Sequence, residues 1–168
     1  LGYVPQKGVL FSGTIDSNIR YGKPEITDAQ VKEAAEVAQA TEFIDTKPEK
    51  YESPVSQGGT NVSGGQKQRL SIARAIAKDP EIFIFDDSFS ALDFKTDSQL
   101  RKALKEYTKD ATTVIVAQRI STILGADQII VLDEGKIMGV GTSEELLATN
   151  EIYREVYESQ VKGGEDDE

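Results

Sequence analysis

Apolar and polar positions follow two different patterns along the chain. From residue 82 onward, short apolar runs alternate with stretches of helical periodicity, an order that predicts an α/β fold built on parallel strands. The run Ile82–Phe85 is unbroken and apolar, as in a strand buried on both faces. Residues 1 to about 60 contain segments rich in Ala, Glu and Gln, and we expect this part to be mostly helical.

Local signals place the individual elements. Thr27 is positioned to cap a helix over Asp28–Ala40, and Thr142–Glu145 has the spacing of a capping box for a later helix. The turn Asp133-Glu134-Gly135 predicts a hairpin. The other predicted elements are a helical turn at Thr41–Asp45, a helix after Ser63, strands at Ile82–Phe85, Thr112–Ala117, Gln128–Leu132 and Lys136–Val140, a helix at Lys95–Tyr107, and a packed apolar stripe of Ile152, Tyr153, Val156 and Tyr157.

The segment Asn61–Lys78 opens a helix with a serine followed by two glycines. The first amides of a helix have no partner within it, and together they carry roughly half a positive charge. Ser63 can act as the N-cap, while Gly64 and Gly65 leave the backbone open to a phosphate. This helix start therefore predicts an anion site.

Two adjacent carboxylates, Asp86 and Asp87, follow the apolar run Ile82–Phe85. Ligands of open α/β sheets bind at the carboxyl ends of the strands. Mg²⁺ takes carboxylate and phosphate oxygens while keeping several waters, so this pair suits a magnesium–nucleotide site. The alternative is that the two side chains merely solvate a strand end, which the Ser-Gly-Gly-Gln segment shortly before them disfavours.

Five segments, taken in order, resemble motifs of ATP-binding cassette (ABC) ATPases of the exporter branch, and together they cover nearly all of residues 1–160. The matching segments are Tyr3–Gln6 with residues 11–15 and 18–22 (Q-loop region), Asn61–Gln66 (signature motif), Ile82–Asp87 (Walker B strand), Ser90–Asp93 (D-loop) and Val114–Thr122 (switch-loop region), followed by residues 125–136 and 141–142 of the usual C-terminal end.

The resemblance implies an α/β fold: a P-loop NTPase (RecA-like) core fragment with an ABC helical subdomain, in which the Walker A portion is missing. It divides the chain into residues 1–80 (Q-loop, helical subdomain and signature helix), 81–160 (C-terminal part of the ATPase core) and 161–168 (an acidic, disordered tail). No Gly-x-x-x-x-Gly-Lys-Ser/Thr loop occurs in the sequence. In the family that loop precedes the Q-loop. We therefore expect a larger polypeptide with a membrane domain, and we expect this piece alone to be inactive.

The resemblance also implies roles for individual residues, with ATP and Mg²⁺ as cofactors. It implies catalytic roles for Gln6, Asp87 and Gln118, metal contacts from Gln6 and Asp86, and nucleotide contacts from Ser63, Gly64, Gly65, Gln66 and Asp93. In such proteins each ATP lies between one subunit's phosphate loop and Walker B strand and the other subunit's signature helix. The signature residues would therefore complete the partner's site.

Two positions depart from the hydrolytic pattern of the family. The residue after the Mg²⁺ aspartate is usually glutamate, and here it is Asp87, whose carboxylate is withdrawn by about 1.5 Å. Gln118 stands where the family has the switch histidine, and the sequence contains no histidine. A glutamine amide can hydrogen-bond a γ-phosphate but carries no positive charge. Both changes weaken the same step, in which a base activates water and charge develops on the phosphoryl group.

The paired departures resemble the degenerate subunit of a heterodimeric ABC multidrug exporter, whose partner carries the consensus Glu and His. This implies an energy-coupling subunit at the cytoplasmic face of the cell membrane, held there by its own N-terminal transmembrane domain. Two alternatives stay open. One is a symmetric homodimer in which Asp87 and Gln118 suffice for hydrolysis. The other is a non-transport, nucleotide-gated ABC module, which the exporter-like segment Phe11–Ile15 disfavours.

The segment Ser53–Thr60 lies where exporters carry a loop that contacts the partner's membrane domain. The family usually has glutamate where Gln57 stands, so transmission through this loop is expected to be altered. An ordinary loop rich in Gly, Ser and Pro is the alternative.

Composition narrows the class of partner. The formal net charge of −10 over 168 residues argues against nucleic acid, whose binding requires a basic face, and so against DNA-repair relatives that share the signature motif. The absence of cysteine excludes a disulfide framework. No apolar run approaches the ~20 residues that cross a bilayer, so any membrane connection is expected to come from residues preceding this chain.

Overall fold

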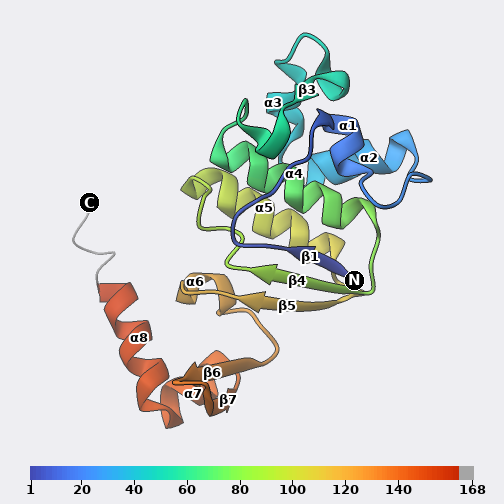
Figure 1. Cartoon of the computed structure of the whole chain (residues 1–168). Coiled ribbons are helices and arrows are strands. Elements are labelled where there is room, and N and C mark those ends of the chain that lie inside the picture. Colours follow the sequence, from blue (N-terminus) through green and yellow to red (C-terminus); the bar gives the residue numbers. More distant parts are fainter. Residues whose placement is uncertain (163–168) are drawn as a thin grey trace. The chain divides into compact units, whose positions relative to one another are not determined.

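The computed structural model describes residues 1–162, which form two compact units (Figure 1). The first spans Leu1–Val116 and the second begins at Ala117. Each unit buries its own set of apolar side chains. The division of the chain by motif, predicted at residues 80 and 160, is not a division into compact units, and it stays a prediction.

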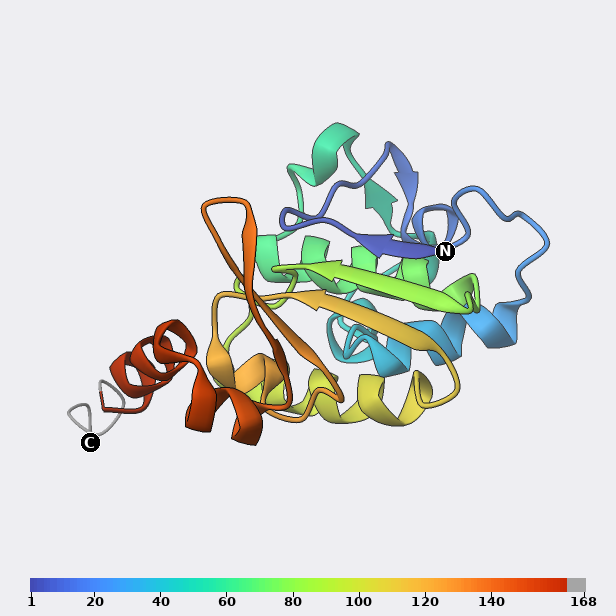
Figure 2. The ribbon, with the colours of Figure 1, turned by 90° about the horizontal axis from the view of Figure 1, so that it is seen from below.

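The first unit is built on a parallel sheet with the strand order β1-β4-β5, formed by Gly2–Val4, Ile82–Asp86 and Thr112–Val116. Parallel strands need long crossovers. Helices α4 (Gly64–Ala77) and α5 (Phe94–Tyr107) supply them and lie on one face of the sheet (Figure 2). The strand predicted at Ile82–Phe85 is confirmed as part of β4, but it is not buried on both faces as expected. Phe83 and Phe85 on one face are each 1% exposed, whereas Ile82 on the other face is 44% exposed.

The expectation that residues 1 to about 60 are mostly helical is wrong, because loops and turns make up much of this part and three short strands lie in it. Besides β1 in the core sheet, β2 (Gly13–Thr14) and β3 (Pro54–Val55) pair antiparallel. Runs of two or three residues are too short to show a strand period, and these strands exist because a distant strand pairs with them. The helical elements of this part are α1 (Ile15–Ile19), α2 (Asp28–Val37), α3 (Thr41–Asp45) and the 3₁₀ turns η1 (Lys50–Glu52) and η2 (Gln57–Gly59).

Helix α2 begins where it was predicted and ends three residues early. Thr27 accepts a hydrogen bond from the Gln30 amide, which confirms the N-cap. At the other end Gln39 adopts a φ of 56°, and its amide and that of Ala40 donate to the carbonyls of Glu36 and Ala35. This is a Schellman ending, which glycine usually signals. A glutamine in that position gives no such signal, so the predicted end at Ala40 was wrong.

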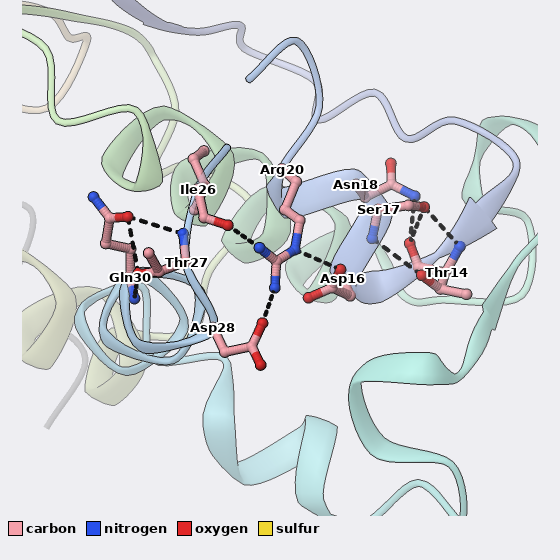
Figure 3. Close-up of polar contacts among 9 residues, drawn as sticks. All are labelled: Thr14, Asp16, Ser17, Asn18, Arg20, Ile26, Thr27, Asp28 and Gln30. Atoms are coloured by element: carbon pink, nitrogen blue, oxygen red, sulfur yellow. Dashed lines mark hydrogen bonds and ion pairs between the residues drawn. The ribbon is translucent and has the colours of Figure 1, made fainter. Parts of the chain in front are cut away.

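Arg20 joins the three segments that surround it (Figure 3). Its guanidinium bonds the carboxylates of Asp16 and Asp28 and the carbonyl of Ile26. The end of α1, the following loop and the start of α2 are thereby held together. The pKa of Arg20 is raised, first by its hydrogen bond to Asp16, so the guanidinium stays charged at all relevant pH values.

Asn18 and Arg74 form a second, more buried polar junction. Asn18 is only 1% exposed. Its side chain accepts a hydrogen bond from the Phe11 amide and donates to the carbonyls of Phe11 and Thr14, each at 2.9 Å. Arg74 on α4 donates to the Asn18 carbonyl and side chain and to the carbonyl of Val9, all at 2.8 Å. Burial lowers the pKa of Arg74. The segment after β1 is therefore fastened to α4 by paired polar groups.

The second unit contains α6 (Ile120–Ile123), the hairpin of β6 (Ile129–Asp133) and β7 (Lys136–Gly141), α7 (Ser143–Thr149) and α8 (Glu151–Lys162). The strands pair antiparallel across a turn in which Glu134 and Gly135 both have positive φ, which confirms the predicted hairpin. Thr142 and Glu145 form the predicted capping box. In the apolar stripe of α8, Tyr153 is buried, whereas Val156 is 41% exposed and does not pack as predicted.

The predicted disordered tail, 161–168, begins inside helix α8, because Val161 and Lys162 are helical. Residues 163–168 lie outside the described part of the chain. Within residues 1–162, no helix is both long enough and apolar enough to cross a bilayer.

Replacing Asn18 with alanine should destabilise the chain strongly. The change removes the partner of the Phe11 amide and of the Phe11 carbonyl in a partly buried position, and each unpaired buried group costs about 1–3 kcal/mol. We expect the free energy of unfolding to fall by about 3 kcal/mol, measured by urea unfolding followed by circular dichroism. Glu33→Ala, an exposed position on α2, serves as the control and should change stability by less than about 0.5 kcal/mol. A similarly small change in Asn18→Ala would contradict this account.

Candidate functional site

The predicted metal and catalytic carboxylates lie at the carboxyl end of the central strand. Asp86 is the last residue of β4, and Asp87 follows it with a φ of 43°. The left-handed region is one that Asp tolerates better than most residues. The Asp87 amide donates to the Val116 carbonyl at 2.8 Å, so the turn is tied to the neighbouring strand. Both side chains are half-buried.

The segment after β1 brings Gln6 to these carboxylates. Val4 pairs with Phe85, so the residues that follow each strand emerge at the same edge of the sheet. Gln6 Nε2 donates to Asp87 Oδ2 at 3.1 Å. Three of the predicted site residues, Gln6, Asp86 and Asp87, are therefore brought together; we call them the strand-end set.

Tyr3 is a member of this neighbourhood that the sequence did not suggest. Its hydroxyl donates to Asp86 Oδ2 at 3.2 Å. Desolvation first, and then the bond to Asp86, raise the pKa of the Tyr3 hydroxyl above its usual value, so it remains a donor. Tyr3 is 53% exposed, and its contact restrains the Asp86 carboxylate from one side.

The segment that carries Gln6 is fastened at both ends. Gln68, 1% exposed on α4, donates through Nε2 to the Pro5 carbonyl at 3.1 Å and accepts from the Gly8 amide at 2.8 Å. A Cβ on Gly8 would lie 2.8 Å from the carbonyl group of Lys67, so only glycine permits this approach. Ser88 Oγ donates to the Val4 carbonyl at 2.8 Å. The position of Gln6 is therefore set by α4 and by the turn after β4.

The start of α4 has the geometry that the sequence predicts. Ser63 Oγ accepts from the Gln66 amide at 3.2 Å, and Gln66 Oε1 accepts from the Ser63 amide at 3.1 Å, so the two form a capping box. Ser63 and Gly64 are exposed, and within residues 1–162 no atom apart from the adjoining residues and the backbone of α4 lies within 4 Å of the place where a Cβ on Gly64 would be. The capping role of Gln66 was not predicted. We call residues 63–66 the helix-start set.

The D-loop segment lies beside the helix-start set. A Cβ on Gly65 would be 3.5 Å from the Ala91 carbonyl, and Arg69 Nε donates to the Gly65 carbonyl at 3.4 Å. Asp93 caps α5 by accepting from the Thr96 amide at 3.0 Å. Arg69 also donates to the Gln39 carbonyl, and burial lowers its pKa.

The Asp93 cap makes part of the stability of α5 dependent on pH. Hydrogen bonds from Thr96 are the main reason that the pKa of the Asp93 carboxyl lies below its usual value. Because the folded-state pKa is lowered, the stabilisation is present above about pH 4 and is lost as pH falls through the lowered pKa. Asp93 is ionised at neutral pH. It caps helix α5, a structural role in addition to the predicted nucleotide contact.

Gln118 belongs to the second unit. It is exposed and lies between β5 and α6. Its carbonyl accepts from Gln160 Nε2, and the Ile120 amide donates to Gln160 Oε1, both at 2.8 Å. The contact with Gln160 was not predicted, because a glutamine on an exposed helix face gives no sequence signal.

The segment predicted to contact a membrane domain is closed by Asn61. The Asn61 side chain donates to the Pro54 carbonyl at 2.8 Å and accepts from the Ser56 amide at 3.0 Å. Gly58 and Gly59 have φ values of 68° and 64° between these points. The loop is thereby a compact turn that ends directly at the start of the signature segment.

The donor set at the strand end fits a magnesium ion that arrives with a nucleotide. Asp86 offers a carboxylate and Gln6 an amide oxygen, and hard oxygen ligands of this kind suit Mg²⁺ when phosphate oxygens and waters complete its shell. Within residues 1–162, no group of three or more acidic, His or Cys side chains could hold a metal by itself. Asp86 and Gln6 therefore fit a cation whose remaining ligands are phosphate oxygens and waters.

A family model described as ABC transporter matches residues 1–90. An uncharacterized ABC transporter ATP-binding protein of Mycobacterium tuberculosis is 48% identical over 163 residues, which is 95% of this chain and 28% of that protein. A candidate multidrug export ATP-binding/permease protein of Staphylococcus aureus is 46% identical over 160 residues, with the same two shares. The structure of a bacterial Atm1-family ABC exporter with ATP bound matches with a TM-score of 0.91 at 39% identity, over 95% of this chain and 28% of that one.

The chain spans about 28% of the length of these relatives. The predicted fold class, a P-loop NTPase core with its ABC-type helical part, is confirmed by the family match and by the structural match. On these grounds the chain belongs to the ABC transporter family, as a nucleotide-binding domain of the exporter type.

Proposed function

We propose that this chain is the ATP-binding part of an ABC exporter subunit whose own catalytic site hydrolyses ATP slowly. The observation that carries the proposal is the contact of Gln6 with Asp87 at 3.1 Å, beside Asp86 at the same strand end. It gathers a metal ligand, a water-orienting carboxylate and an amide where a nucleotide phosphate would lie. ATP and Mg²⁺ are the cofactors that this arrangement suits.

In the proposed site, Asp86 and the amide oxygen of Gln6 hold Mg²⁺ together with phosphate oxygens. A metal ion there would neutralise charge on the phosphate oxygens. Tyr3 donates to Asp86 and so restrains which carboxylate oxygen faces the ion. The metal and phosphates would come from a nucleotide that is also held by a phosphate loop outside this chain.

Asp87 has the role of orienting the attacking water, and it performs that role poorly. A base must lie within about 2.6–3.2 Å of the proton that it takes, or act through one water. The Asp side chain is one methylene shorter than Glu, and the Gln6 amide already occupies one of its oxygens. Loss of an effective base typically lowers the rate by 10²–10⁴-fold.

Gln118 weakens the same step from the phosphate side. Its amide can donate to a γ-phosphate, but it cannot carry the positive charge that a protonated histidine would bring to the developing negative charge. ATP can therefore be held at this site without being turned over rapidly.

The helix-start set would act on the partner's nucleotide. The open amides of α4 after Ser63, with exposed Gly64, form the surface on which a phosphate held by another subunit can rest. In the proposed complex the partner carries the consensus Glu and His, and its site is completed by Ser63, Gly64, Gly65 and Gln66. Ala91 and Leu92 of the D-loop lie next to this surface.

The remaining parts of the proposal concern the whole protein. An N-terminal transmembrane domain would hold this part at the cytoplasmic face of the membrane, and the loop closed by Asn61 would contact the partner's membrane domain. The net charge of −10 supports a function without nucleic acid. The isolated chain is expected to be inactive.

Restoring the two consensus residues should restore hydrolysis at this site. In the complete protein, in a complex whose partner site is silenced, Asp87→Glu with Gln118→His should raise ATP turnover by on the order of 10²-fold. The reason is that the longer carboxylate reaches the attacking water and the imidazole supplies the missing charge. Steady-state release of phosphate measures the change. Unchanged turnover in the double variant would refute the impaired-site assignment.

A charge placed on the helix-start set should damage the partner's site instead. Gly64→Glu has open space and an acidic residue is favourable at a helix start, so folding is preserved. The carboxylate should nevertheless repel the partner's triphosphate and lower trapping of nucleotide there by at least about tenfold. Site-resolved nucleotide trapping measures this.

Gly125→Glu is the matched control, because Gly125 also has open space for a Cβ in the described part of the chain but lies outside the helix-start set. It should leave trapping at both sites unchanged. If Gly64→Glu depresses trapping at this chain's own site and spares the partner's, the cross-subunit role of α4 is wrong.

A further inference from the structure

The side chain of Gln160 bridges two positions of the switch-loop region. Its Nε2 donates to the Gln118 carbonyl and its Oε1 accepts from the Ile120 amide, each at 2.8 Å. These partners are 42 and 40 residues away in the sequence. One amide side chain from α8 therefore hydrogen-bonds the backbone on both sides of Arg119.

The bridge satisfies backbone groups that regular structure leaves open. Strand β5 ends at Val116 and α6 begins at Ile120, so neither element pairs the backbone at Gln118. Arg119 is the N-cap of α6 but makes no side-chain cap bond. The first amides of a helix need such a partner, and Gln160 takes the place of the missing cap for Ile120.

The amide can make this bridge in only one orientation. With Oε1 and Nε2 exchanged, two donors would face each other at Ile120 and two acceptors at Gln118. The bridge therefore fixes the loop backbone relative to α8 as a peptide group of a neighbouring strand would.

Helix α8 holds Gln160 in register through its buried face. Tyr153 is 3% exposed and packs with Ile120 and Leu146, and its hydroxyl lies 2.9 Å from Ser143 Oγ. Tyr157 packs against the same cluster. Gln160 follows Tyr153 and Tyr157 at positions i+7 and i+3, so it emerges on the face that the core positions.

We propose that Gln160 is a positioning residue for the nucleotide site: it holds the main chain of Gln118 and so directs the Gln118 side chain to the γ-phosphate. This inference rests on the role proposed above for Gln118. Gln160 is exposed and lies on the wall of an open hollow of about 470 Å³ between α6 and α8, so water can compete for both bonds. Each bond is worth about a fivefold to tenfold shift in the population of the held loop.

The test uses the complete protein with Gln160→Met, which keeps the length of the side chain and removes both bonds. Hydrogen exchange at the amides of residues 118–122 should become about tenfold faster. Ser159→Ala is the matched control on the same helix, since among the described residues Ser159 Oγ bonds only the Val156 carbonyl within α8. It should leave exchange in this segment unchanged. Equal exchange in Gln160→Met and the unmodified protein would overturn the bridge.

A double-mutant cycle connects the bridge to nucleotide. With unmodified Gln118, Gln160→Met should weaken ATP binding at this subunit's site at least about fivefold, whereas in a Gln118→Ala background it should change binding less than twofold. Equal losses in both backgrounds would overturn the positioning role. Gln160→Glu, which retains the acceptor for Ile120 but not the donor for Gln118, should restore slow exchange at residue 120 and leave ATP binding weakened.

The same measurements separate this inference from the function on which it rests. If Gln118→Ala alone leaves ATP binding unchanged, the proposed role of Gln118 fails. Faster exchange in Gln160→Met would then still establish the bridge as a structural clamp, while the positioning role for nucleotide would be overturned with the role of Gln118.

Discussion

The buried amide of Gln68 is the contact on which the arrangement of the site depends. It bonds both the Pro5 carbonyl and the Gly8 amide, and it lies on the helix whose first residues form the helix-start set. Leaving such buried groups unpaired costs about 1–3 kcal/mol each, so the segment that carries Gln6 cannot shift independently of α4. Helix α4 therefore links two groups of residues. It carries the helix-start set, proposed to serve the partner's nucleotide, and through Gln68 it holds the segment with Gln6, proposed to serve this chain's own nucleotide.

Signals that depend on neighbouring residues alone were sufficient for much of the fold. The caps at Thr27, Ser63 and Thr142 correspond to observed helix starts because their hydrogen bonds lie within three residues. The run Ile82–Phe85 corresponds to an observed strand because its unbroken apolar composition is itself a local signal, although its pairing partners are distant. Strand β1 escaped prediction for the opposite reason. Its three residues are a strand because β4 pairs with them, and that partner lies about 80 residues away.

In the candidate site too, the residues were predictable from local motifs, whereas the contacts between them were not. The motif spacing indicated Asp86, Asp87 and Gln6, but their contact with one another follows from the register of β1 against β4. Tyr3 and Gln160, whose hydrogen-bond partners lie 83 and at least 40 residues away in the sequence, sit on exposed positions with no periodic or motif signal. A single sequence identifies side chains that carry chemistry more readily than side chains that orient them, since orientation is a property of the tertiary contacts.

The backbone at Asp87 bears on how its shortened side chain should be interpreted. Its φ of 43° lies in the left-handed region, where Asp is accepted several-fold more often than Glu. The aspartate therefore suits the local conformation apart from any effect on catalysis. Gln118 has no such conformational reason, since a histidine could present the same carbonyl to Gln160. In the proposed impaired site both departures act together, and of the two the loss of the histidine charge at Gln118 is the greater.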